Sequence, residues 1–185
     1  MDSFAQRFEA AAKAAGSRTL YAPGPEIVDV PEDVRRKYKS SGAAVFAWGK
    51  ALLDAAAPKH PAVLLSGIYF GQYGVSGTVA FSALAGYARG LGMLVICDEG
   101  IRITEANAVF AALAYLTPPT GTDLSETHRI PLEEHGFNAD ALVVSPESEK
   151  NALERLCKAA SEAGREVMVP EGKDGFKGLV SGGEY

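Results

Sequence analysis

Acidic side chains follow the most clearly buried-looking segment of this 185-residue sequence. The apolar run 93–97 leads directly into Asp98 and Glu99. In parallel α/β folds the working surface lies at the carboxyl ends of the strands, because the loops that follow them meet there. Carboxylates crowded at such an end raise one another's pKa, which suits them to act as acid and base. We therefore take Asp98 and Glu99 as the candidate catalytic residues if the protein is an enzyme.

A structural interpretation of the same residues stays open. Adjacent residues on an extended strand point to opposite sides, so only one of this pair can face the mouth of a site directly. Other acidic residues follow predicted strands at Glu26, Glu147 and Glu171, and together with the pair they could bind a divalent cation. The simpler interpretation is that most of them stabilise helix N-termini through the helix dipole.

Hydroxyl and cationic groups extend the candidate site. Ser66 and Ser145 each end a predicted strand, and Arg102 lies shortly after Asp98, so we take these three as candidate ligand-binding residues. Neither serine lies in a G-x-S-x-G elbow. The glycines after Ser66 lack the G-x-G-x-x-G spacing and the P-loop lysine, and the histidines lack metal-ligand spacing. The sequence therefore predicts no cofactor and no metal site.

The charge and hydropathy of the chain exclude two classes of partner. With a net charge of -5 and a pI near 5.3, it is a poor match for nucleic acid, which is held by clustered Lys and Arg. The short basic cluster 35–39 is interpreted as a solvated helix face. The most apolar stretch, 79–97, is interrupted by a charge and two glycines and cannot cross a membrane. We expect a soluble protein without membrane insertion.

The two cysteines and the N-terminus suggest a compartment. Cys97 and Cys157 lie in a predicted strand and a predicted helix, and they are interpreted as small buried hydrophobes in a reducing environment. Residues 1–15 carry acids among apolar residues, which predicts an amphipathic helix and not a secretory signal. We expect the cytoplasm or another reducing compartment, and a removed targeting peptide stays an open alternative.

Strand-like apolar runs alternate with runs of helical period, the pattern of βαβ units and a parallel sheet. The predicted strands are 18–22, 62–66, 93–97, 141–144 and 166–169, and the predicted helices are 34–57, 75–89, 105–116 and 148–163. We interpret residues 1–170 as a single α/β domain with an irregular arm at 117–138. The Gly-rich tail 171–185 is expected to be partly disordered or docked on a partner.

Several segments carry a family resemblance. Residues 62–74 contain a strand followed by two aromatics and glycines, and 94–103 form a strand ending in Asp98. Residues 138–146 form a strand ending at a proline, and 166–169 form another. In outline and order this stretch resembles the orotidine 5'-phosphate decarboxylase family, in particular its bacterial-type branch. The resemblance implies a TIM-barrel fold in a partial or modified form, and the alternative is a flavodoxin-like open sheet with five strands.

The departures from that family concern its catalytic charges. The family's Asp-x-Lys-x-x-Asp motif aligns with Asp98, but Gly100 stands at the lysine position and Ile103 at the second aspartate. Leu64 stands at the position of the family's strand lysine, and Arg102 falls where the family has glycine. A carbanion without a neighbouring cation is not stabilised, so the resemblance implies that orotidylate decarboxylation is absent.

Two functional hypotheses follow. In the first, the protein is a non-catalytic pseudoenzyme that acts as a structural or assembly subunit. Since fewer strands are predicted than the eight of a closed barrel, a second copy or a partner protein would cover the exposed sheet edge. In the second, the chain is a lyase, isomerase or hydrolase of a small polar metabolite that uses Asp98 and Glu99.

Overall fold

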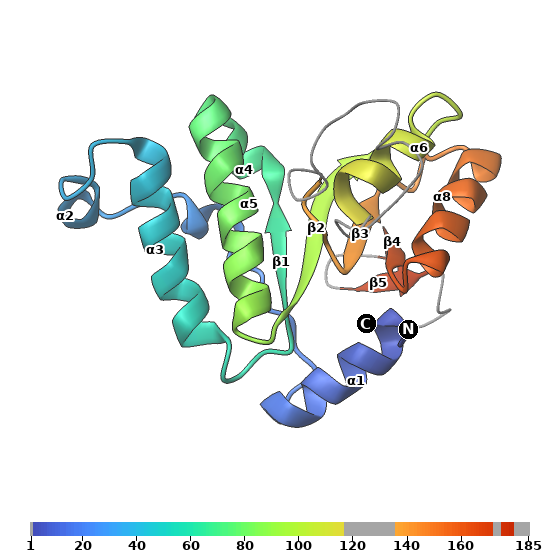
Figure 1. Cartoon of the computed structure of the whole chain (residues 1–185), viewed down its shortest axis with the longest axis horizontal. Coiled ribbons are helices and arrows are strands. Elements are labelled where there is room, and N and C mark those ends of the chain that lie inside the picture. Colours follow the sequence, from blue (N-terminus) through green and yellow to red (C-terminus); the bar gives the residue numbers. More distant parts are fainter. Residues whose placement is uncertain (1, 117–135, 172–174, 180–185) are drawn as a thin grey trace. The chain divides into compact units, whose positions relative to one another are not determined.

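The computed structural model describes residues 2–116, 136–171 and 175–179. The chain divides into two compact units (Figure 1). The N-terminal unit is Arg7–Glu99, and the C-terminal unit comprises Met1–Gln6 and Gly100–Tyr185. The predicted single domain 1–170 stays a prediction. Residues 117–135 of the predicted arm 117–138 lie outside the described residues.

The N-terminal unit is mainly helical. Its elements are α1 (Phe4–Ala15, which begins in the other unit), η1 (Gly24–Ile27), α2 (Glu32–Arg35), α3 (Ser41–Ala56), β1 (Ala62–Ser66), α4 (Gly67–Gly71), α5 (Gly74–Gly90) and β2 (Leu94–Ile101). Helices α3 and α5 lie side by side (Figure 1). They approach closely because Gly42 faces the backbone of Ser76, where a Cβ would lie 2.5 Å from the carbonyl oxygen.

Strands β1 and β2 run parallel and form the core of this unit. Ala62 pairs with Leu94, and the register continues to Ser66 opposite Asp98. Val63, Leu65, Val95 and Ile96 are at most 1% exposed, as expected for strands covered on both faces. The predicted strand 18–22 is reduced to a single bridge between Tyr21 and Val63. Pro23 lacks an N–H and Gly24 has φ +54°, so the chain turns away into η1.

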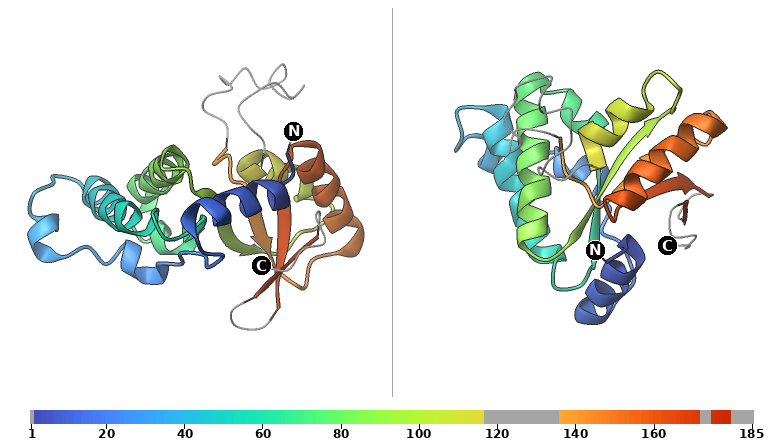
Figure 2. Two further views of the ribbon diagram at one scale, coloured as in Figure 1. Left: turned by 90° about the horizontal axis from the view of Figure 1, so that it is seen from below. Right: turned by 45° about the vertical axis from the view of Figure 1, so that its right-hand side comes forward.

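The C-terminal unit contains α6 (Ala108–Ala111), the π-helical turn η2 (Ala112–Leu116), β3 (Ala141–Val144), α8 (Lys150–Glu162), β4 (Glu166–Pro170) and β5 (Phe176–Gly178). β3 and β4 are parallel, and β5 pairs antiparallel with β4. Helix α8 packs on β4 (Figure 2). The end of β2 belongs here, since Ile101 accepts a hydrogen bond from Ser145 N, 2.9 Å away.

The helix predictions were partly wrong at their ends. The predicted helix 34–57 is two helices, because the Ser40 hydroxyl accepts from Ala43 N at 3.2 Å and starts α3 anew. The predicted helix 105–116 begins at Ala108, since Asn107 Oδ1 accepts from Thr104 N and holds residues 104–107 in a turn. Helix α8 starts after Ser148, whose hydroxyl bonds outside the helix. Strand β5 lies inside the tail that was expected to be partly disordered or docked on a partner, and this strand was not predicted.

Candidate functional site

The register of β1 and β2 brings together three of the residues singled out from the sequence. Ser66 ends β1 directly opposite Asp98, and Glu99 follows on β2. All three are half-buried, whereas the four β2 residues before Asp98 are buried. A hydroxyl and two carboxylates therefore lie where the buried part of the strand pair ends.

Glu99 lies against the start of α4, a helix that the sequence did not predict. Its carboxylate accepts a hydrogen bond from the backbone N–H of Gly67. A Cβ at residue 67 would lie 2.3 Å from Glu99 Oε1, so the carboxylate occupies the space that any other residue would fill. Ser66 immediately precedes α4, and its side chain does not cap the helix.

The surroundings of Glu99 favour its neutral form. Burial raises the pKa of this carboxyl above its ordinary value, and the charge of Asp98 raises it further. The hydrogen bond from Gly67 N–H acts in the opposite direction, but the net shift is upward. Glu99 thus holds a proton to higher pH than an exposed glutamate, which is the property of a general acid.

Arg102 and Ser145 lie in the C-terminal unit and hold its own loop together. Arg102 Nε donates to the backbone oxygen of Glu147 at 3.1 Å, and Nη2 lies 3.6 Å from Glu149 Oε1. Ser145 Oγ accepts from Glu147 N at 3.2 Å, and its backbone oxygen accepts from the Ser148 hydroxyl at 2.7 Å. The candidate ligand-binding role of these two residues stays a prediction.

The motif positions that lack charge have backbones and surroundings suited to their actual residues. Gly100 is exposed with φ +56°, a conformation that residues with a Cβ rarely adopt. Ile103 is fully buried, and its N–H donates to the Ser148 hydroxyl at 2.9 Å. Leu64, in the middle of β1, is half-buried.

Other residues considered from the sequence have structural partners. Glu171 Oε1 lies 3.9 Å from Lys177 Nζ, and His60, expected in solvent, is half-buried with Nδ1 2.9 Å from Thr19 O. His128 and His135 lie outside the described residues. Cys97 is buried, and Cys157, expected to be buried, is half-buried.

No group of three or more His, Cys, Asp or Glu residues that could hold a metal ion occurs within residues 2–116, 136–171 and 175–179. Among the helices that the structure describes, none is both long and apolar enough to cross a membrane.

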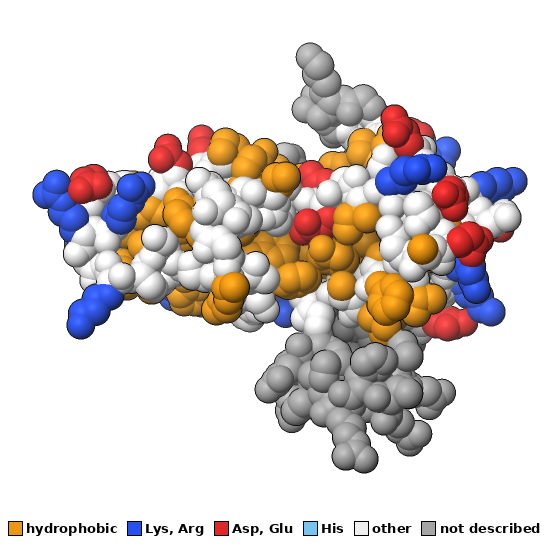
Figure 3. All heavy atoms as spheres, turned by 90° about the horizontal axis from the view of Figure 1, so that it is seen from above, with side chains coloured by type: hydrophobic (Ala, Val, Ile, Leu, Met, Phe, Trp, Pro, Cys, Tyr) orange, Lys and Arg blue, Asp and Glu red, His pale blue; other side chains and the backbone are white. Residues whose placement is uncertain are grey.

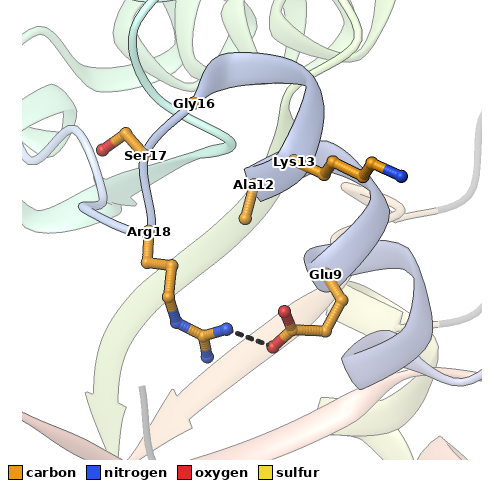
Figure 4. A pocket seen from close by; sticks show the side chains of 6 residues that line it. All are labelled: Glu9, Ala12, Lys13, Gly16, Ser17 and Arg18. Atoms are coloured by element: carbon orange, nitrogen blue, oxygen red, sulfur yellow. Dashed lines mark hydrogen bonds and ion pairs between the residues drawn. The ribbon is translucent and has the colours of Figure 1, made fainter.

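An open hollow of about 410 Å³ at the end of α1 is a feature that sequence reasoning missed (Figure 4). Arg18 pairs with Glu9 across it, and the guanidinium also lies 5.6 Å from the centre of the Phe8 ring. Lys13 points away from that pair. Glu9 therefore compensates the charge of Arg18 at this hollow.

Comparison with known proteins shows what the fold resembles. No protein-family model and no curated protein matches the chain. A putative orotidine 5'-phosphate decarboxylase from Streptomyces avermitilis matches with a TM-score of 0.63 and 18% identity, covering 91% of this chain and 53% of that one. A putative orotidine-monophosphate decarboxylase from Toxoplasma gondii gives 0.65 and 15%, covering 91% and 48%. The decarboxylase of Leishmania donovani gives 0.59 and 18%, covering 90% and 52%.

These likenesses concern the fold. The chain spans about half the length of these three structures. The predicted α/β fold with parallel strands, of the TIM-barrel type found in orotidine 5'-phosphate decarboxylases, is confirmed. None of these three structures is a flavodoxin-like open sheet, so they do not support that alternative.

Proposed function

We propose that the chain is a decarboxylase-like protein without catalytic activity that serves as a structural or assembly subunit. In this proposal it descends from the bacterial-type branch of the orotidine 5'-phosphate decarboxylases and has a degenerate catalytic motif. The observation that carries it is the left-handed backbone of Gly100, at the position where the resemblance implies the catalytic lysine.

The lysine is absent from this position, and the backbone conformation of residue 100 would be strained if a lysine stood there. With φ +56°, residue 100 lies in a region that costs a non-glycine residue roughly 1 kcal/mol or more. Without a lysine, this position supplies no cation to stabilise a carbanion. The cationic residue nearest to this position in the sequence is Arg102, and its guanidinium is directed to Glu147 and Glu149.

The second motif position supports the same proposal. Ile103 is 0% exposed, so an aspartate there would be a desolvated carboxylate in the core of the C-terminal unit. Both departures therefore fit the local structure.

The experiment is to incubate the purified protein with orotidine 5'-monophosphate and measure formation of uridine 5'-monophosphate. We expect no product above the uncatalysed rate. Product that disappears in an Asp98→Asn variant with an unchanged thermal unfolding midpoint would contradict the proposal.

A second candidate function is favoured by the raised pKa of Glu99. A half-buried glutamic acid beside Asp98 and Ser66 could donate a proton to a small polar metabolite while Asp98 acts as base. This would make the chain a lyase, isomerase or hydrolase. It requires that Asp98→Asn abolishes binding of a small polar ligand in a metabolite screen without loss of folding. A variant that binds every ligand like the wild type would exclude it.

A further inference from the structure

The N-terminal unit has a shallow apolar groove between α3 and α5 of about 420 Å³. Ala43 and Phe46 line one wall, and Val79 and Ala83 line the other. Phe46 continues the groove toward Tyr87, with the two rings edge-to-face at 6.5 Å. No charged side chain lines this groove.

Large apolar side chains at its rim are exposed to water. Val79 is 63% exposed, and Val75, one helical turn earlier on α5, is 84% exposed. Hydrophobic and uncharged side chains make up much of the surface over the helices of this unit, with basic and acidic side chains gathered toward one end (Figure 3). An apolar patch that continues into a groove is typical of an interaction surface.

The charge of this face decides which partner suits it. Helix α5 has no charged residue before Arg89, and α3 contains only Lys50 and Asp54. These two form an ion pair of 2.9 Å, and the Tyr87 hydroxyl donates to the same carboxylate at 2.5 Å. The face is therefore neutral, although the whole chain has a net charge of -5.

We infer that this α3–α5 face is an interface between two copies of the chain. Two chains of equal negative charge repel one another, and that repulsion is weakest where both present a neutral surface. A two-fold interface also needs a patch that is complementary to itself. Small and apolar groups meet that requirement, and Lys50 and Asp54 supply one charge of each sign at the edge of the patch. A strongly charged partner would find no opposite charge here.

This inference supplies the partner that the proposed assembly role requires, and it rests on that role. Its test measures self-association, whereas the proposed function is tested by decarboxylation, so failure of one is distinguishable from failure of the other. A dimeric protein with decarboxylase activity would contradict the proposed function and leave the interface in place.

The experiment is sedimentation velocity of the full chain over a wide concentration range. We expect a monomer–dimer equilibrium that Val79→Glu weakens at least about tenfold, because the carboxylate would be buried against an apolar surface. Ala83→Lys, at a second exposed position of the groove, should act in the same direction. The matched control is Phe110→Glu, which changes a 69% exposed side chain on α6 and should leave the equilibrium unchanged.

Far-UV circular dichroism and the thermal midpoint of each variant check that it folds. We expect Val79→Glu to fold, because the Val79 side chain is exposed in the monomer. A wild type that remains monomeric at all concentrations would overturn the inference. So would a dimer that folded Val79→Glu and Ala83→Lys variants leave intact.

Discussion

In the C-terminal unit, carboxylates lie at the amino end of the strand pair β3–β4, and in the N-terminal unit they lie at the carboxyl end of β1–β2. The surroundings of these two groups of carboxylates differ. At the amino end of β3 and β4, Asp140 is 3% exposed and Glu166 is 0% exposed. Arg165 donates to Asp140 Oδ1 at 2.5 Å and to Asn138 Oδ1 at 2.6 Å. At the carboxyl end of β1 and β2, Glu99 is half-buried and takes its hydrogen bond from a backbone N–H.

The difference separates a carboxylate held by an ion pair from one held by a backbone N–H. Asp140 is charge-paired inside the fold, and breaking such a pair exposes the energetic cost of an isolated buried ion. Among the residues that the structure describes, Glu99 has a backbone donor and no ion pair, so its protonation state can change without the loss of such a pair. In α/β folds with parallel strands, residues at the amino ends serve stability and those at the carboxyl ends serve function. The predictions below test that contrast.

The largest effect is expected from Arg165→Met. The substitution keeps much of the side-chain volume but leaves Asp140 buried without its cation, so unfolding should become easier by about 3–5 kcal/mol. Urea unfolding monitored by circular dichroism measures this. The matched control is Arg155→Met, which removes an exposed ion pair to Glu105 and should cost at most about 1 kcal/mol. Equal losses in the two variants would show that Asp140 is not the group that makes Arg165 important.

A smaller effect is expected from Gly67→Ala at the other end. The new methyl group would meet Glu99 Oε1, but the carboxylate is the far end of a flexible side chain and can move aside. We expect a loss of stability of roughly 1 kcal/mol, together with a fall in the Glu99 pKa as the carboxyl moves into water. Carboxyl-carbon NMR titration measures the pKa.

Gly77→Ala is the contrasting substitution for Gly67→Ala. Its Cβ would lie 1.9 Å from the backbone oxygen of Phe70, which cannot move aside as a side chain can. It should destabilise the protein more than Gly67→Ala does.

A Glu99 pKa that stays raised in Gly67→Ala would mean that the position of the carboxyl does not depend on its contact with residue 67.

The sequence predicted the positions of strands and helices well where apolar runs were long. The predicted strands 62–66 and 141–144 coincide with β1 and β3, and the predicted helix 75–89 differs from α5 by one residue at each end. Parallel pairing of two such strands was sufficient to place Ser66 near Asp98. The two strands were predictable because burial on both faces leaves a continuous apolar run.

Short elements and local contacts were not predictable in the same way. Helix α4 has five residues between glycines and β5 has three, too few for a period to be recognised. The contact of Glu99 with Gly67 depends on where α4 begins. The ion pair between Asp140 and Arg165 joins residues far apart in the sequence, and no local pattern marks it.

The pH dependence of stability should carry the signature of Glu99. Its folded pKa is raised, so the folded protein binds the proton more tightly than the unfolded chain does. The stabilisation from this group is therefore fully present below the ordinary glutamate pKa and is lost as the pH rises through the folded value. Thermal midpoints of the wild type should fall relative to Glu99→Gln across that window. A difference that is constant with pH would contradict the raised pKa.

The smallest effect concerns Cys157, which reports on the buried charge at the amino end. Burial, together with the smaller effects of the charges of Glu166 and then Glu154, raises the pKa of this thiol to about 11. Alkylation by iodoacetamide at mildly alkaline pH should therefore be slow, because only the thiolate reacts. Glu166→Gln removes the charge with the larger effect on the thiol and should speed alkylation more than Glu154→Gln does. If Glu166→Gln leaves the rate unchanged while Glu154→Gln raises it, Glu166 is not a charged member of the amino-end group, and the contrast with Glu99 would rest on Asp140 alone.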